Sequence, residues 1–175
     1  MSDREALVAT ASHTIGPFFH FAVVDDKLGL MTERFAGGEP VRLIVRVTDG
    51  SGEPVSDALI ELVQAGVFGR MATGADGTCE FETMRPGTTG STEGEAADVA
   101  AHIDLCLFAR GLLRQLHTRI YFAGDAALTS DPALALVPAE RRDTLIATPD
   151  PSPGDDAWLF HIRLQGPSET IFFDV

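Results

Sequence analysis

The sequence predicts an all-β protein: a β-sandwich with an irregular N-terminal arm and long loops. Two observations carry this prediction. From residue 41 onward, short segments alternate apolar and polar residues, which is typical of half-buried strands. The chain also holds 17 glycines and 10 prolines in 175 residues, enough to separate many short strands with turns. We expect a single domain over residues 1–175, with an arm at 1–40 and a sandwich core at 41–175.

The individual strands follow from this alternation. Val41, Leu43, Val45 and Val47 occupy every second position, and residues 49–52 (Asp-Gly-Ser-Gly) form a turn signal directly after them. In the segment 102–108, the apolar residues again fall on one face and the more polar ones on the other. Strands are expected at 41–48, 58–64, 78–83, 102–108, 116–122, 158–164 and 170–175.

The segments between these strands carry weaker signals. Residues 64–76 are expected to form a short connection that ends in the turn Asp76-Gly77. Residues 88–101 are rich in Gly, Ser, Thr, Glu and Ala without periodicity, so they predict a surface loop or a simple spacer. Asp131-Pro132 is expected to open a short helical stretch, and residues 139–146 are compatible with a helix.

Composition narrows the classes of function. The chain has 13 basic and 26 acidic residues, and its formal charge of −13 disfavours nucleic acid as a partner. No stretch reaches the roughly 18 apolar residues of a membrane span, and residues 1–14 lack the apolar core of a signal peptide. Cys79 and Cys106 form neither a disulfide framework nor a zinc motif. We therefore expect a cytoplasmic protein with reduced cysteines.

The histidines are the first candidates for metal ligands. His102 and Asp104 stand two apart on an expected strand, so their side chains point to the same face and could reach one metal ion. A polar edge of the sandwich explains the same spacing without a metal, and we favour that explanation from the residues alone. His117 and His161 lie opposite the apolar positions of their strands, where solvent or a partner protein is expected.

Several motifs resemble, in the same order, those of the intradiol ring-cleavage dioxygenases. They are Gly16-Pro17, 47–55 (VTDGSGEPV), 61–65 (ELVQA), 76–77 (DG), 83–87 (TMRPG) and 102–103 (HI). Within this family, the chain is most similar to the alpha chain of the two-chain members that act on protocatechuate. That likeness rests on 107–111 (LFARG), 116–122 (LHTRIYF), 141–147 (RRDTLIA), 160–166 (FHIRLQG) and 169–174 (ETIFFD). One departure is Val63, which stands where the family usually has tryptophan.

The resemblance implies a non-haem ferric ion, which the family holds with two tyrosines and two histidines. In this chain the ligand positions fall on Met71, Thr89, His102 and Asp104, and Val99 replaces a nearby arginine. The chain has a single tyrosine, Tyr121, at none of these positions. A thioether and a hydroxyl cannot replace two tyrosinates, so we expect no iron in this chain. The resemblance places the Fe3+ in a partner beta chain.

The resemblance also implies a role for this chain at the partner's active site. The residues that match pocket-lining positions of the family are Thr14, Gly16, Pro17, Phe18 and Arg110. The expected assembly is a higher-order αβ oligomer in which protocatechuate and O2 meet at the shared site and yield 3-carboxy-cis,cis-muconate. Two alternatives stay open: a stand-alone β-sandwich that binds a partner without catalysis, and a self-sufficient dioxygenase with a non-standard iron site.

Overall fold

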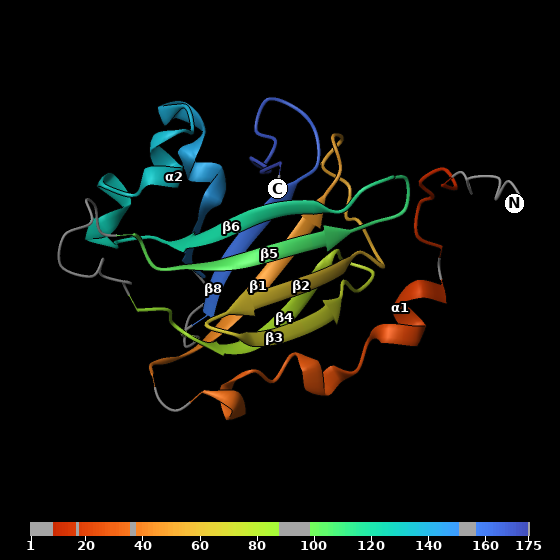
Figure 1. Ribbon diagram of the computed structural model, residues 1–175, viewed down its shortest axis with the longest axis horizontal. Helices are drawn as coiled ribbons and strands as arrows, with labels where there is room; N and C mark the ends of the chain where they lie inside the picture. The colour runs from red at the N-terminus through yellow and green to blue at the C-terminus, as the bar shows by residue number, and fades with distance from the viewer. Residues whose placement is uncertain (1–8, 17, 36–37, 88–98, 151–156, 175) are drawn as a thin grey trace, which may run out of the picture.

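The computed structural model describes residues 9–16, 18–35, 38–87, 99–150 and 157–174. Within these ranges, two layers of β-sheet pack face to face (Figure 1). The strands run in the order β3-β2-β5-β6-β7-β8-β1-β4, and the end strands β3 and β4 also contact each other. The predicted all-β sandwich is thus confirmed, as a sheet nearly closed on itself. Its strands are β1 (Pro40–Thr48), β2 (Leu59–Gln64), β3 (Val67–Ala72), β4 (Thr78–Met84), β5 (His102–Phe108), β6 (Leu116–Phe122), β7 (Ile146–Pro149) and β8 (Ala157–Arg163).

The core lies between the two layers, where the apolar positions of the alternating strands meet. Leu43, Val45 and Val47 of β1 are fully buried. They share one cluster with Phe81 of β4 and Phe160 of β8, and with the buried apolar residues of β2, β5 and β6. Burial of these side chains is the main stabilising contribution to the fold, at about 25 cal/mol per Å² of apolar surface. The opposite faces of both layers are left for polar residues and for contacts outside the sandwich.

Three segments differ from the sequence-based prediction. Residues 67–72 form strand β3 instead of a plain connection, because Ala65 (φ 48°) and Gly66 (φ 80°) close a two-residue hairpin turn. Residues 146–149 form β7, which lies parallel to β6 and bridges the two layers. Residues 170–174 make only an isolated bridge, between Phe173 and His117, so the strand predicted there is wrong.

The arm contains more regular structure than expected. It holds α1 (Phe18–Val23) and two 3-10 helices, η1 (Asp26–Leu28) and η2 (Thr32–Arg34), which run beside β3 (Figure 1). Met31 is fully buried, and it packs where Gly69 of β3 leaves room by having no side chain. The arm is therefore fixed to the sandwich at this point. In the described ranges, no helix has both the length and the apolar character needed to cross a bilayer.

The short helix predicted to open at Asp131-Pro132 is confirmed as α2 (Pro132–Ala135), within a longer helical segment that follows β6. That segment comprises η3 (Ala126–Thr129), α2 and η4 (Ala139–Leu145), and Asp131 is the N-cap of α2. The Asp131 side chain is buried and accepts four hydrogen bonds. Its Oδ1 accepts from the Tyr121 hydroxyl (3.1 Å) and from the amides of Ala133 (2.9 Å) and Leu134 (2.8 Å), while Oδ2 accepts from the Ala100 amide (3.0 Å). One carboxylate thus joins β6, α2 and the segment that leads into β5.

We predict that Asp131→Ala destabilises the protein by about 2–4 kcal/mol, because it removes a helix cap and leaves buried donors without partners. Asp25→Ala is the matched control: Asp25 also caps a helix, but it is exposed and accepts from one amide, that of Lys27. That control should cost about 1 kcal/mol or less. Chemical denaturation of the purified variants measures both values. Equal losses would mean that the buried carboxylate has no special role.

Candidate functional site

The outer face of β2, β5 and β6 carries the residues that the sequence singled out. Because side chains alternate along β5, His102, Asp104, Cys106 and Phe108 share this face, as expected. The strand register places Asp104 opposite Arg119 of β6, and Cys106 opposite His117. A hollow of about 620 Å³ opens here. Its lining combines charged residues with apolar ones, and the apolar residues include Val63, Phe108, Leu136 and Phe173.

The charged groups on this face are paired with one another. Asp104 lies 3.4 Å from Arg119 (Oδ1 to Nε) and 3.9 Å from His102 (Oδ1 to Nε2). On β2, Glu61 accepts a hydrogen bond from Arg70 of β3 (Nε to Oε1, 2.8 Å). Asp104 and Glu61 are thus each engaged by an arginine, while Asp174 lines another part of the hollow.

His102 and Asp104, at the two histidine-ligand positions of the family, lie beside each other, but Met71, at one of the tyrosine-ligand positions, does not join them. The other ring nitrogen of His102, Nδ1, is 2.9 Å from the carbonyl of Ala100. Met71 pairs with Ile60, which is fully buried in the core, so Met71 lies on the opposite face of the sheet from His102 and Asp104. Val99 is half-buried just before β5, and Thr89 lies outside the described residues.

Tyr121 is the one tyrosine of the chain, and it is directly opposite His102. The two rings are 5.5 Å apart, but the hydroxyl donates to Asp131. Burial, reinforced by the Asp131 charge and opposed by Arg119, raises the pKa of the Tyr121 phenol to about 12. The Tyr121 phenol therefore stays protonated near pH 7 and remains hydrogen-bonded to Asp131. With Met71 on the other face and Asp104 paired to Arg119, the described donor set does not fit a ferric site.

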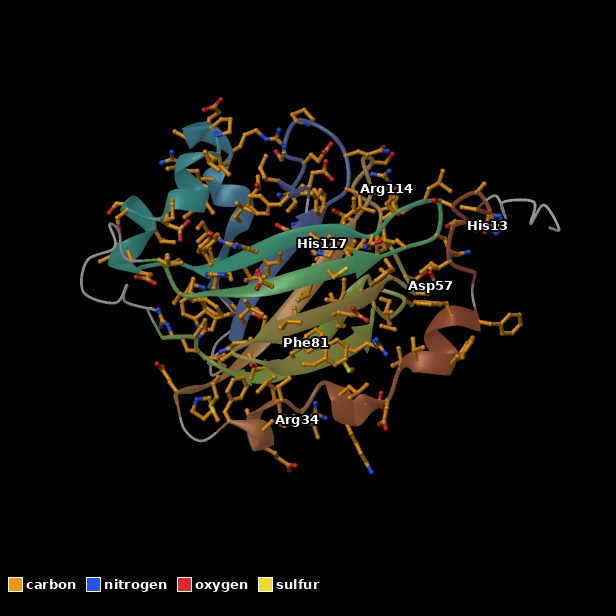
Figure 2. All side chains as sticks on the ribbon, viewed as in Figure 1. His13, Arg34, Asp57, Phe81, Arg114 and His117 are labelled. Atoms are coloured by element: carbon orange, nitrogen blue, oxygen red, sulfur yellow. The ribbon has the colours of Figure 1, made fainter. Side chains whose placement is uncertain are left out.

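The arm residues form a second cluster at the other end of β5. Thr14 accepts a hydrogen bond from the amide of Gly111 (2.7 Å), just past the end of the strand. Arg110 pairs with Asp57 through two contacts of 3.2 Å, from Nε to Oδ1 and from Nη2 to Oδ2. Figure 2 shows His13 of the arm and Asp57 at this end of the sheet, beside the β5–β6 turn that carries Arg114. Residues distant in sequence, Thr14 and Arg110, are thus brought together.

Several arm residues are exposed. The Phe18 side chain is 80% exposed and that of Phe21 72%, although Phe19 packs on Phe108 with ring centroids 6.0 Å apart. Gly16 has open space around it, since an added Cβ would meet nothing within 4 Å. Pro17 lies outside the described residues. The Phe18 ring contacts that of Phe21, with centroids 6.4 Å apart, and both rings remain largely exposed.

Sequence reasoning missed the groups that depend on pairing between strands. Asp57 gives no motif of its own, yet its backbone (φ 59°) and its pairing with Arg110 set the position of that arginine. The Asp104–Arg119 pair likewise depends on the register of β5 against β6, which neither strand reveals alone. The positive φ of Gly111 (90°) is the only one of these features that its residue type signals.

The sequence of this chain is similar to those of known proteins. The family model described as "Dioxygenase" matches residues 66–166. The protocatechuate 3,4-dioxygenase alpha chain of Burkholderia cepacia is 40% identical, over 97% of this chain and 98% of the relative. That of Pseudomonas putida is 35% identical over the same shares.

This chain belongs to the intradiol dioxygenase family. Within the family it groups with the alpha chains, because the beta chain of the Burkholderia cepacia enzyme is 32% identical over only 63% of this chain and 57% of its own length. The fold agrees: catechol 1,2-dioxygenase from Pseudomonas arvilla C-1 superimposes with a TM-score of 0.59 at 22% identity, covering 81% of this chain and 58% of the solved one. Intradiol dioxygenases use non-haem ferric iron, and the names of these relatives describe an enzyme with two kinds of chain.

We predict that the lone chain binds ferric iron no better than an unrelated acidic protein, because Tyr121 is held neutral and Asp104 is held by Arg119. Metal analysis after dialysis against ferric salts measures this, with the His102→Ala variant expected to retain as little iron as the natural chain. Stoichiometric iron with a visible tyrosinate absorption band would contradict the assignment.

Proposed function

We propose that this chain is the alpha subunit of a protocatechuate 3,4-dioxygenase and lines the active site of its beta chain. The observation that carries the proposal is its end-to-end similarity to curated alpha chains, at 40% identity over 97% of the chain. The donor set on β5 and β6, which does not fit a ferric ion, supports placing the Fe3+ in the beta chain. The reaction converts protocatechuate and O2 to 3-carboxy-cis,cis-muconate.

Ferric iron in the beta chain supplies the activation of the catechol for attack by O2. The residues of this chain help to bind the substrate, to orient it and to enclose it. Substrate brings a carboxylate and develops negative charge on its ring oxygens when it binds. Such charge needs positive partners in a site from which water is excluded, because an unpaired buried charge costs several kcal/mol.

We assign that task to Arg110. Its guanidinium is held on one side by Asp57, yet the side chain is 57% exposed, so donors remain for a group outside this chain. Arginine keeps its charge at any working pH and donates parallel hydrogen bonds to a carboxylate. Thr14, Gly16 and Phe18 would extend the same lining, because the Thr14–Gly111 hydrogen bond sets the arm beside Arg110. Pro17 is assigned to the lining from the family resemblance alone.

The beta chain would cover the exposed apolar residues of the arm and of the outer face. Phe18, Phe21 and Leu136 are each more than two-thirds exposed, and Val63 is 44% exposed. A stable complex of this kind typically buries about 2,000 Å² or more. The αβ pairs assemble further into a higher-order oligomer.

We place the protein in the cytoplasm. Both cysteines are free, and burial raises the pKa of the Cys79 thiol to about 12 and that of Cys106 to about 11. Thiols of this kind persist as inert, reduced groups in a reducing compartment.

Reconstitution tests the assignment. Neither chain alone should turn over protocatechuate at the rate of the complex, and co-expression with the beta chain from the same source should yield a complex that takes up O2 in equal amount to the substrate consumed. Oxygen-electrode assays on each chain and on the mixture measure this. Full activity of the beta chain alone, with no affinity for this chain, would overturn the proposal and favour a stand-alone binding module.

Arg110→Ala in the complex should lower kcat/KM for protocatechuate about tenfold to a hundredfold, which corresponds to the loss of one charge-assisted interaction. Iron content and assembly should be unchanged. Arg42→Ala is the control, since Arg42 is also an arginine paired with a carboxylate, Glu80, but on the other layer. Equal kcat/KM for the two variants would show that Arg110 is an ordinary surface charge.

A further inference from the structure

A second hollow, of about 410 Å³, opens on the outer face of the other layer. It lies over β1 and β8 and between two loops, residues 49–52 and 165–168. The two strands are parallel, and their register places Arg46 beside His161 and Thr48 beside Arg163. Two arginines from different strands therefore line one hollow, and it lies on the other layer from the hollow over β2, β5 and β6.

These arginines differ in pairing from several other arginines of the chain. Both are exposed, and within the described part of the chain neither guanidinium forms an ion pair or a side-chain hydrogen bond. By contrast, Arg42, Arg70 and Arg110 each pair with a carboxylate. In a chain with 26 acidic residues, two neighbouring arginines without a carboxylate at ion-pair distance form a local site for negative charge.

His161 lies beside these two arginines in the lining of the hollow. Its Nε2 is 3.0 Å from the hydroxyl of Thr48, a residue only 3% exposed, so the ring is held in place. Burial and the charges of Arg163 and Arg46 lower the pKa of His161 to about 4. The imidazole is thus neutral near pH 7, and its other ring nitrogen has no hydrogen-bond partner among the described residues.

The nearby acids are engaged with their own turns. Asp49 also lines the hollow, but its Oδ1 accepts from the amides of Ser51 (2.8 Å) and Glu53 (3.0 Å). Asp76, at the next turn, accepts from the amide and the hydroxyl of Thr78. These hydrogen bonds, with a smaller contribution from the charge of Arg46, lower the pKa of Asp76. Asp76 therefore offsets part of the Arg46 charge, although neither carboxylate lies at ion-pair distance from Arg46 or Arg163 in the described structure.

We propose that this hollow binds a small oxyanion with two or more negative charges, either phosphate or a compound with several carboxylates. The guanidiniums of Arg46 and Arg163 hold it from two sides, and each fork can donate parallel hydrogen bonds to an oxyanion. The hydroxyls of Ser51 and Ser168, at the rim, are further donors. The site does not depend on the proposed function, because every residue in it belongs to this chain.

Calorimetric titration of the full chain, with and without its beta chain, tests the site. The probes are inorganic phosphate and citrate, with acetate at matched ionic strength as the monovalent control. We expect saturable binding of phosphate or citrate but not of acetate. Arg46→Gln and Arg163→Gln should each weaken it about tenfold or more. Arg42→Gln, on the same strand but paired with Glu80, should leave it unchanged.

The outcomes separate the possibilities. Preference for phosphate identifies a phosphate-bearing ligand, and preference for citrate a polycarboxylate. No saturable binding, or equal loss in Arg42→Gln, would overturn the proposal. Binding that the beta chain abolishes would also overturn it and assign the arginines to an acidic segment of that partner. Both arginines are exposed, so the variants should keep the melting temperature of the natural chain, and either one tests the site if the other unfolds.

Discussion

The buried carboxylate of Asp131 is the constraint on which the site depends. It accepts hydrogen bonds from β6, from α2 and from the segment that leads into β5, so it fixes three parts of the outer layer relative to one another. The same carboxylate accepts from the hydroxyl of Tyr121, and burial together with the Asp131 charge raises the pKa of that phenol to about 12. A group that stabilises the fold thus also holds the hydroxyl of the single tyrosine of this chain, the residue type that supplies two of the family's iron ligands.

Two other positions that match iron ligands of the family are likewise unsuited to a metal in this chain. Where an iron-binding relative needs free ligands, this chain pairs Asp104 with Arg119 and places Met71 on the other side of the sheet. The intradiol fold is retained, since burial between the two layers does not require the metal. What remains exposed is the arm and Arg110, and these are the residues that we assign to the beta chain's active site.

Alternation predicted the strands that bury one face, because the two-residue period of β1 and β5 is visible in the sequence itself. It failed at β3, where the hairpin turn uses Ala65 in a left-handed conformation and Gly69 faces a buried methionine. The candidate residues of the site were found through family resemblance, whereas their partners were not. Asp57 opposite Arg110, and Arg46 beside His161, depend on register between strands far apart in sequence.

We propose that the two chains divide the work, with iron in one and part of the pocket in the other. The most direct measurement is the iron content of the purified αβ complex, followed by separation of the chains under native conditions and metal analysis of each. The account predicts one ferric ion per αβ pair, all of it in the beta chain fraction. Two ferric ions per pair, or iron that remains with this chain, would contradict it.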